Sequence, residues 1–207
     1  MFYSELQCSE AIRKAVERMG FAEMTEIQEK TIPVMLAGHD VIAKAPTGTG
    51  KTCAFGIPVA EHIQPENKYP QAVIMAPTRE LAQQIAEELS NLTYFMPEVQ
   101  VACVYGGANM EKQAKRLAEG CQIVVATPGR LMDHYKHHSI DISHVTQIVL
   151  DEADEMLNMG FYKDVRHIIE MMKARKALSM FSATISREVM DIGWLYQHNA
   201  EEITVQP

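Results

Sequence analysis

A short loop over residues 45–52 carries the residue types that cradle phosphate groups. Its sequence, Ala-Pro-Thr-Gly-Thr-Gly-Lys-Thr, follows the apolar run 41–43 and precedes a helix-compatible segment, which is the context of a phosphate-binding loop. The usual pattern begins with Gly, and here Ala45 takes that place. The two glycines let backbone N–H groups turn toward an anion, and the helix adds the positive end of its dipole. We expect Lys51 to reach the β- and γ-phosphates and Thr52 to bind Mg²⁺.

The acidic segment Asp-Glu-Ala-Asp over 151–154 is a second candidate for chemistry, because it directly follows the apolar run 148–150. A carboxylate pair at the tip of a buried strand is costly to desolvate unless a metal ion or a cation compensates its charge. We interpret Asp151 as a ligand of Mg²⁺, usually through water, and Glu152 as the general base that polarises the attacking water. The alternative is that these acids cap the next helix.

Three further segments follow apolar runs and have both a structural and a functional interpretation. Thr78 could simply cap the helix that follows it. Thr127 followed by Pro128 is also typical of a helix start. The pair Gly106-Gly107 is either a permissive turn or a surface that the backbone of a ligand approaches closely.

The amino-terminal segment is predicted to form two helices. The first is short, over 9–19, with Ser9 as its N-cap. The second is predicted over 26–36, because the spacing Thr25-x-x-Gln28 is typical of a capping box. From spacing alone we favour helix capping as the role of Gln28.

The elements that must position these residues alternate along the chain. Short, nearly continuous apolar runs indicate parallel strands buried on both faces, and helical segments lie between them, most clearly over 79–92 and 161–172. We predict an α/β fold with an open, mostly parallel sheet and helices on both faces. In such sheets ligands bind at the carboxyl ends of the strands. The apolar runs are 41–43, 72–76, 99–104, 123–126, 148–150 and 178–181.

Composition limits the class of protein. The chain has 207 residues, enough for one domain with a sizeable core, and a net charge of −8 at pH 7. That charge argues against a broad basic surface, so any nucleic-acid contact must be local. We see neither an apolar stretch of about 20 residues nor a signal peptide, and we expect a cytoplasmic protein. The four cysteines lack Cys-x-x-Cys spacing, which indicates reduced thiols rather than a zinc site or a disulfide.

Two residue groups carry little functional signal. His134, His137 and His138 could suggest a metal site, but no cysteine or acidic ligand set accompanies them, and we interpret them as a solvated helix end. Several of the methionines are interpreted as core filler rather than as a partner groove. They are Met156, Met159, Met171 and Met172.

The candidate segments occur in an order that resembles the amino-terminal lobe of a DEAD-box RNA helicase, a RecA-like P-loop NTPase domain. The resemblance covers nearly all of the chain as a single domain, with an adenine-motif region over 1–36 and a phosphate-loop core over 37–207. One motif could be chance, whereas the ordered set is highly specific. The seven motifs are 20–28, 45–52, 77–82, 106–107, 127–130, 151–154 and 182–184.

The resemblance implies that ATP and Mg²⁺ bind here and that Phe21 stacks on adenine while Gln28 hydrogen-bonds the adenine edge. This implication overrides the capping interpretation of Gln28. Lys51, Asp151 and Glu152 would be the catalytic residues, and Thr52 and Asp151 would hold the metal. The remaining nucleotide contacts would come from the phosphate loop, at Thr47, Gly48, Thr49 and Gly50.

The resemblance also implies an RNA partner, bound through its sugar-phosphate backbone without reading of sequence. The link between the nucleotide site and the RNA site would be Asp154 with Ser182 and Thr184. The RNA contacts would come from Thr78, Arg79, Gly107, Thr127, Gly129 and Arg130.

Two positions depart from the family pattern. Met24 stands where the family usually has Pro. We expect this difference to affect the affinity for nucleotide rather than the resemblance to the family. The family also has an isolated aromatic residue upstream, where this chain has Phe2 beside Tyr3, and the sequence does not decide between them.

A second RecA-like lobe is expected to complete the enzyme. Nothing after Thr184 resembles the family's remaining motifs, which include the arginines that stabilise the transferring phosphoryl group. We therefore expect an interlobe boundary near Pro207 and a nearly inactive isolated lobe. The sequence leaves open an ATP-gated RNA clamp with incidental turnover and a DNA-directed motor of the same superfamily.

Overall fold

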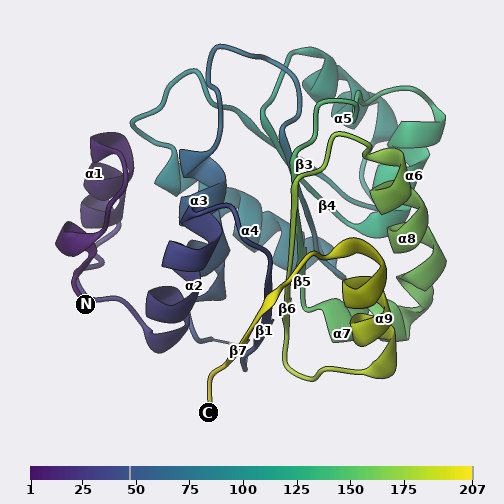
Figure 1. Ribbon diagram of the computed structural model, residues 1–207. Helices are drawn as coiled ribbons and strands as arrows, with labels where there is room; N and C mark the ends of the chain where they lie inside the picture. The colour runs from purple at the N-terminus through teal and green to yellow at the C-terminus, as the bar shows by residue number, and fades with distance from the viewer. Residues whose placement is uncertain (47, 207) are drawn as a thin grey trace.

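The computed structural model describes residues 1–46 and 48–206 (Figure 1). The described residues form one sheet of seven strands in the order β3-β4-β2-β5-β6-β1-β7, and every pairing is parallel. This confirms the predicted open, parallel α/β sheet. The strands are β1 (Val41–Lys44), β2 (Ala72–Met75), β3 (Val101–Val104), β4 (Ile123–Ala126), β5 (Gln147–Asp151), β6 (Ala177–Ser182) and β7 (Glu201–Thr204).

Helices cover both faces of the sheet (Figure 1). The apolar core is correspondingly divided into two clusters, one beneath α1 to α4 and the other beneath α5 to α9. The first four helices are α1 (Glu10–Arg18), α2 (Glu26–Leu36), α3 (Lys51–Glu61) and α4 (Arg79–Leu92). The others are α5 (Met110–Ala118), α6 (Pro128–Lys136), α7 (Ala153–Met156), α8 (Tyr162–Met171) and α9 (Arg187–Tyr196), with short helical turns η1 (Tyr3–Glu5) and η2 (Leu157–Phe161).

The alternation of side chains along the strands explains the two clusters. In β2 every residue is buried, with Ile74 in the first cluster and Val73 and Met75 in the second. A strand that contributes to two cores must be apolar at each position, so its sequence reads as a continuous apolar run. This is why continuous apolar runs, rather than an alternation of apolar and polar residues, predicted the strands.

The amino-terminal helices agree closely with the sequence interpretation. The side chain of Ser9 accepts a hydrogen bond from the Ile12 N–H at 3.4 Å, as expected of the N-cap of α1. Helix α2 has the predicted bounds, and its first turn contains the capping box. Helix α2 packs against α3, which brings the amino-terminal segment beside the phosphate loop.

Strand β7 was missed in the sequence. Of its four residues only Ile203 is buried, so the segment lacks the apolar run that marks the other strands. It pairs with β1 at the edge of the sheet, so residues for which no strand was predicted extend the sheet by one strand. Residue 207, the expected boundary, lies outside the described residues.

The interpretation of Met159 as core filler was wrong. Met159 is exposed in η2, where Gly160 has a φ of +92° and breaks the helix before α8, whereas Met156 and Met172 are buried as expected. The four cysteines are free thiols. Within the described part of the chain, no helix is long and apolar enough to cross a membrane.

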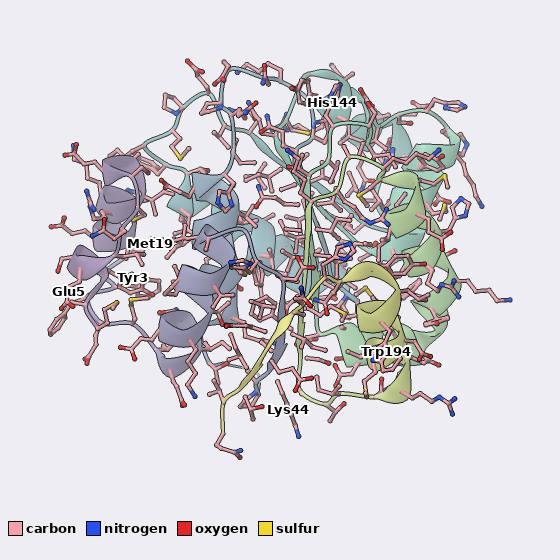
Figure 2. The ribbon with its side chains drawn as sticks, in the orientation of Figure 1. Tyr3, Glu5, Met19, Lys44, His144 and Trp194 are labelled. Atoms are coloured by element: carbon pink, nitrogen blue, oxygen red, sulfur yellow. The ribbon has the colours of Figure 1, made fainter. Side chains whose placement is uncertain are left out.

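A large exposed side chain marks the edge of the sheet near β7. Trp194 on α9 is 86% exposed. It lines a hollow of about 360 Å³ together with Lys44 and Ile203. Figure 2 shows Trp194 and Lys44 on the same side of the molecule, at α9 and at the end of β1.

Candidate functional site

The sheet order divides the candidate residues into two neighbouring groups. Strands β1, β5 and β6 are consecutive in the sheet, and their carboxyl ends carry the phosphate loop, the acidic segment and Ser182. Strands β3, β4 and β2 form the adjacent half, and their carboxyl ends lead to Gly107, Thr127 and Thr78. Both groups therefore lie along the same edge, where open α/β sheets bind ligands.

Lys51 and Asp151 meet at the centre of the first group. The Lys51 Nζ lies 3.4 Å from an Asp151 carboxylate oxygen, and the two side chains are only 7% and 2% exposed. Burial raises the pKa of Asp151, and the Lys51 ammonium partly offsets that rise. Lys51, the first residue of α3, thereby contacts Asp151, the last residue of β5, and both side chains are largely shielded from solvent.

Glu152 occupies an unusual backbone conformation beside this pair. Its φ is +47°, in the left-handed region that non-glycine residues rarely adopt. It precedes α7 but makes no side-chain capping bond, and the Asp151 side chain accepts its N–H at 3.0 Å. Burial raises the pKa of Glu152, while Lys51 opposes that change. The alternative interpretation, in which these two acids cap α7, is not what the structure shows.

Gln28 has two structural roles at once. Its Oε1 accepts the Thr25 N–H at 3.0 Å, which is the capping-box bond, and also accepts a hydrogen bond from the Tyr3 hydroxyl. Its Nε2 donates to the carbonyl oxygen of Gly50 at 3.1 Å. The capping interpretation is therefore correct for one contact, and another contact joins Gln28 to the phosphate loop. Its expected role in adenine recognition stays a prediction.

Gly50 makes this close approach possible. Its φ is +83°, and a Cβ atom there would lie 2.6 Å from Gln28 Nε2 and 3.1 Å from the Thr25 hydroxyl oxygen. Only glycine fits both the backbone conformation and the space. Gly48 has a φ of +82°, and the Thr49 hydroxyl donates to the Pro46 carbonyl at 2.8 Å. Thr47, predicted to contact nucleotide, lies outside the described residues.

The structure distinguishes the two upstream aromatic residues. Tyr3 is buried, its ring stacks on Phe21 with centroids 6.4 Å apart, and its hydroxyl contacts Gln28. Phe2 is 53% exposed and forms a backbone bridge with Glu23. Of the two, Tyr3 is thus the residue whose side chain contacts Phe21 and Gln28. Phe21 is 42% exposed and also lines a hollow with Arg18 on the side of α4.

Asp154, Ser182 and Thr184 form a hydrogen-bonded cluster. The Ser182 side chain accepts the Asp154 N–H at 3.0 Å and donates to the Thr184 carbonyl at 2.7 Å. The Thr184 hydroxyl donates to the Asp154 carboxylate at 2.7 Å. Burial acts to raise the pKa of Asp154, but these hydrogen bonds outweigh it and lower that pKa. The cluster joins the end of β6 to α7, so the three residues predicted to link the two sites are in direct contact.

The second group begins at the turns after β2 and β3. The Thr78 side chain accepts the Leu81 N–H at 3.2 Å, so the capping interpretation of Thr78 is correct. The Arg79 guanidinium lies over the Tyr105 ring at 4.8 Å. A Cβ atom on Gly107, whose φ is +85°, would lie 4.0 Å from Arg79. The two turns are therefore neighbours, as their predicted common ligand requires.

Thr127, Gly129 and Arg130 lie where β4 leads into α6. The Thr127 side chain makes no capping bond, unlike Thr78, although Pro128 stands at the first turn of the helix as expected. The three residues line a hollow of about 400 Å³ together with Gly106 and Phe161. Thus three of the residues predicted to contact RNA line one depression in the surface, beside the turn that carries Gly107.

A buried polar network supports this depression, and sequence reasoning missed it. Gln113 on α5 contacts the Tyr105 carbonyl, Arg130 and His134. The interpretation of His134 as part of a solvated helix end was wrong, because its side chain is fully buried, and this burial lowers its pKa. No local sequence signal marks Gln113, which lies on an otherwise ordinary polar helix. Its contacts arise only when α5 and α6 pack side by side.

The donors at the first group fit a magnesium ion. Asp151 and Thr52 offer hard oxygen ligands, and the two carboxylates of Asp151 and Glu152 outnumber the single ammonium of Lys51. Within the described residues no group of three or more His, Cys, Asp or Glu side chains could hold a metal ion by itself. Mg²⁺ usually takes one or two protein ligands with the rest from water and phosphate, and Asp151 and Thr52 would be those ligands.

Comparison with known proteins agrees with this geometry. A family model described as DEAD/DEAH box helicase matches residues 25–192. The ATP-dependent RNA helicase CshA of Limosilactobacillus reuteri is 47% identical over 206 residues, covering 100% of this chain and 41% of that protein. The DEAD-box ATP-dependent RNA helicase CshA of Geobacillus kaustophilus is 44% identical over 204 residues, covering 99% and 44%. The chain thus spans less than half the length of these curated relatives.

Solved structures show the same relationship. The crystal structure of a DEAD box protein from the hyperthermophile Methanococcus jannaschii superposes with a TM-score of 0.91 at 39% identity, covering 100% of this chain and 56% of that one. A hypothetical ATP-dependent RNA helicase from Sulfolobus tokodaii gives a TM-score of 0.88 at 40% identity, covering 95% and 57%. Since the family model spans most of the chain and includes the phosphate loop, the acidic segment and the turns around the depression, the chain belongs to the DEAD/DEAH box helicase family.

Proposed function

We propose that this chain is the ATP-binding lobe of an RNA helicase. It binds Mg-ATP and the RNA backbone and, together with a second RecA-like lobe, hydrolyses ATP to separate or remodel RNA duplexes. The observation that carries this proposal is the buried contact between Lys51 and Asp151, because it places a phosphate-binding cation and a metal-binding carboxylate at one strand edge. The relatives named as ATP-dependent RNA helicases support the same function.

The residues of the first group have separate roles in this proposal. Lys51 binds the β- and γ-phosphates, and Thr52 and Asp151 would hold Mg²⁺. The metal, when bound, neutralises charge that develops on the phosphates. Glu152, next to Asp151, accepts a proton from the attacking water. Gln28 selects adenine from a position where it already contacts Gly50 of the phosphate loop.

RNA binds at the second group. The turn that carries Gly107 and the helix start that carries Arg130 border one depression, Arg79 lies next to Gly107, and these residues contact the phosphates and sugars of one strand. Backbone contacts of this kind position a strand but carry no sequence information, which suits a protein with a net charge of −8. The contacts among Asp154, Ser182 and Thr184 connect the nucleotide side of the strand edge to the loop after β6.

A second lobe is required for turnover in this proposal. Arginine fingers contribute roughly 10³–10⁵-fold to phosphoryl transfer. The sequence between Thr184 and the last residue offers no motif that resembles them. The relatives are more than twice as long as the matched region, which leaves room for such a lobe in those proteins.

The test compares this chain with the same chain joined to the carboxyl-terminal lobe of a relative such as the Limosilactobacillus reuteri protein. Steady-state ATP hydrolysis is measured with and without single-stranded RNA, and strand separation is measured on a short RNA duplex. We expect RNA-stimulated hydrolysis and strand separation from the joined protein only. Robust RNA-stimulated turnover by the single lobe would contradict the role assigned to the second lobe. Stimulation by DNA but not RNA would contradict the RNA assignment.

A further inference from the structure

A single buried amide holds together the elements that surround the RNA-facing depression. Gln113, on α5, is largely buried. Its Oε1 accepts from Arg130 Nη1 at 3.1 Å and lies 3.0 Å from His134 Nε2, and both partners belong to α6. Its Nε2 donates to the carbonyl oxygen of Tyr105 at 3.0 Å, in the turn after β3. The amide thus connects three segments that are distant in sequence.

The orientation of the amide and the tautomer of His134 follow from these contacts. A carbonyl oxygen only accepts hydrogen bonds, so His134 must donate through an Nε2–H. If the amide were reversed, its NH₂ group would face the Arg130 guanidinium and its oxygen would face the Tyr105 carbonyl. Both contacts would be repulsive. Only one orientation of the Gln113 amide makes all of its contacts favourable, so these contacts fix that orientation.

Within the described part of the chain, the Arg130 guanidinium makes hydrogen bonds to the protein through only one of its nitrogens, Nη1. Its Nη1 donates to Gln113 and to the Ala108 carbonyl at 3.0 Å, which uses both hydrogens of that nitrogen. Its nearest carboxylate is Asp133, 3.7 Å from Nε, and the buried Nε has no hydrogen-bond partner among the described residues. The side chain lines the depression beside Thr127 and Gly129. The guanidinium is therefore held in one position through Nη1, and Nη2, which makes no hydrogen bond among the described residues, is the donor that remains for a phosphate.

We propose that Gln113 is a positioning residue for RNA binding, which, braced by His134, orients Arg130 and the turn from Tyr105 to Ala108 together toward the RNA backbone. This inference rests on the proposed function, because it assumes that Arg130 contacts RNA. A long arginine side chain loses much rotamer freedom when it binds. Gln113 and the Ala108 carbonyl remove that freedom before RNA arrives, so binding requires less ordering.

The test uses the whole chain and four substitutions. Gln113→Met keeps the approximate volume and removes every hydrogen bond of the amide, and Gln7→Met makes the same change at an exposed position before α1. His134→Met removes the brace, and His134→Gln keeps an N–H donor. For each protein we would measure affinity for a fluorescent single-stranded RNA at several salt concentrations, affinity for a fluorescent ATP analogue, and thermal unfolding.

We expect Gln113→Met to weaken RNA binding by about threefold to tenfold, the range that one net hydrogen bond contributes, and to leave nucleotide affinity unchanged. The slope of log affinity against log salt should fall by less than about 0.7, the value for loss of one full phosphate contact to a single strand. His134→Met should weaken RNA binding in the same direction, and His134→Gln and Gln7→Met should not. If Gln113→Met does not fold, the two His134 variants provide the same comparison.

A double-substitution cycle with Arg130→Ala decides whether Gln113 acts through Arg130. If it does, Gln113→Met should add no further loss of RNA affinity once Arg130 is already alanine. Additive losses, or unchanged RNA affinity in Gln113→Met and His134→Met, would overturn the inference and leave the proposed function intact. Equal, negligible RNA affinity in the unaltered chain and in Arg130→Ala would instead overturn the proposed RNA binding itself.

Discussion

Gln28 donates a hydrogen bond from its Nε2 to the carbonyl oxygen of Gly50 at 3.1 Å. This contact joins the first turn of α2 to the phosphate loop before α3. Since the same side chain closes the capping box of α2 through Thr25 and accepts the Tyr3 hydroxyl, the amino-terminal segment and the loop are one hydrogen-bonded unit. A nucleotide bound at the loop should therefore also stabilise the first turn of α2.

Substitution of Gly50 by alanine should disrupt this unit. The added Cβ would lie 2.6 Å from Gln28 Nε2, in addition to the strain of a φ of +83°. The strain alone should cost about 1–2 kcal/mol of unfolding free energy. Gly38→Ala is the matched control, because Gly38 has a φ of +87° with no atom within 4 Å of its Cβ position. Urea unfolding and nucleotide titration of both variants separate strain from the clash.

Only Gly50→Ala should lose nucleotide affinity, and its loss of stability should exceed that of Gly38→Ala. Equal effects of the two substitutions on stability, with nucleotide affinity intact in both, would show that the contact between Gln28 and Gly50 has no functional consequence.

Substitution of Gln28 by alanine should reduce the preference for ATP over GTP more than it reduces affinity for the phosphates. A site with polar contacts to one base rejects another base that leaves those contacts unpaired. We expect discrimination to fall by about threefold to tenfold, the range for one net hydrogen bond. Competition titrations with ATP, GTP and inorganic triphosphate measure this. An unchanged ATP preference would restore helix capping as the main role of Gln28.

Substitution of Glu152 by glutamine should leave ATP binding largely intact and abolish most hydrolysis in the two-lobe protein. The amide keeps the shape of the side chain but cannot accept a proton from water. Loss of a general base typically costs about 10²–10⁴-fold in rate. Glu66→Gln, at an exposed position in the loop before β2, provides the control. A reduction in turnover of less than about threefold would exclude Glu152 as the base.

The burial of His134 should make stability dependent on pH below neutrality. Burial is the main cause that lowers the pKa of His134, the Arg130 and His137 charges act in the same direction, and Asp133 opposes them. As the pH falls below the unfolded histidine pKa of about 6.5, the unfolded chain takes up a proton that the folded chain does not. The free energy of unfolding therefore decreases as the pH falls, until the pH reaches the pKa of His134 in the folded chain.

Urea unfolding at several pH values between 7 and 5 measures this contribution. The unaltered chain should lose up to about 1.4 kcal/mol more per pH unit than His134→Gln does. Identical slopes in the unaltered chain and His134→Gln would show that His134 takes up its proton equally in both states.

Local sequence predicted the elements whose signals are local. Six strands are short apolar runs because each of their faces meets a core, and the bounds of α2 follow from the capping spacing at Thr25 and Gln28. The phosphate loop and the acidic segment were placed correctly relative to each other, since the carboxyl ends of β1 and β5 share one edge of the sheet.

Features that depend on long-range packing could not be predicted in this way. Strand β7 has a single buried residue and is a strand only because β1 offers it an edge. His134 is buried because α5 brings Gln113 against it, 21 residues away in sequence. The contact between Gln28 and Gly50 likewise depends on how α2 packs against α3. In each case the structure of the residue is determined by a contact with a segment distant in sequence, which no local pattern shows.

The central claim is that the phosphate loop binds Mg-ATP through Lys51. Titration of a fluorescent ATP analogue in the presence of Mg²⁺ tests it on the unaltered chain, on Lys51→Ala and on Lys44→Ala, which removes the same charge from an exposed position at the end of β1. Loss of a charge-assisted contact to phosphate should weaken binding by at least about tenfold. We predict this loss for Lys51→Ala, with Lys44→Ala unchanged. An equal dissociation constant for all three proteins would contradict the account.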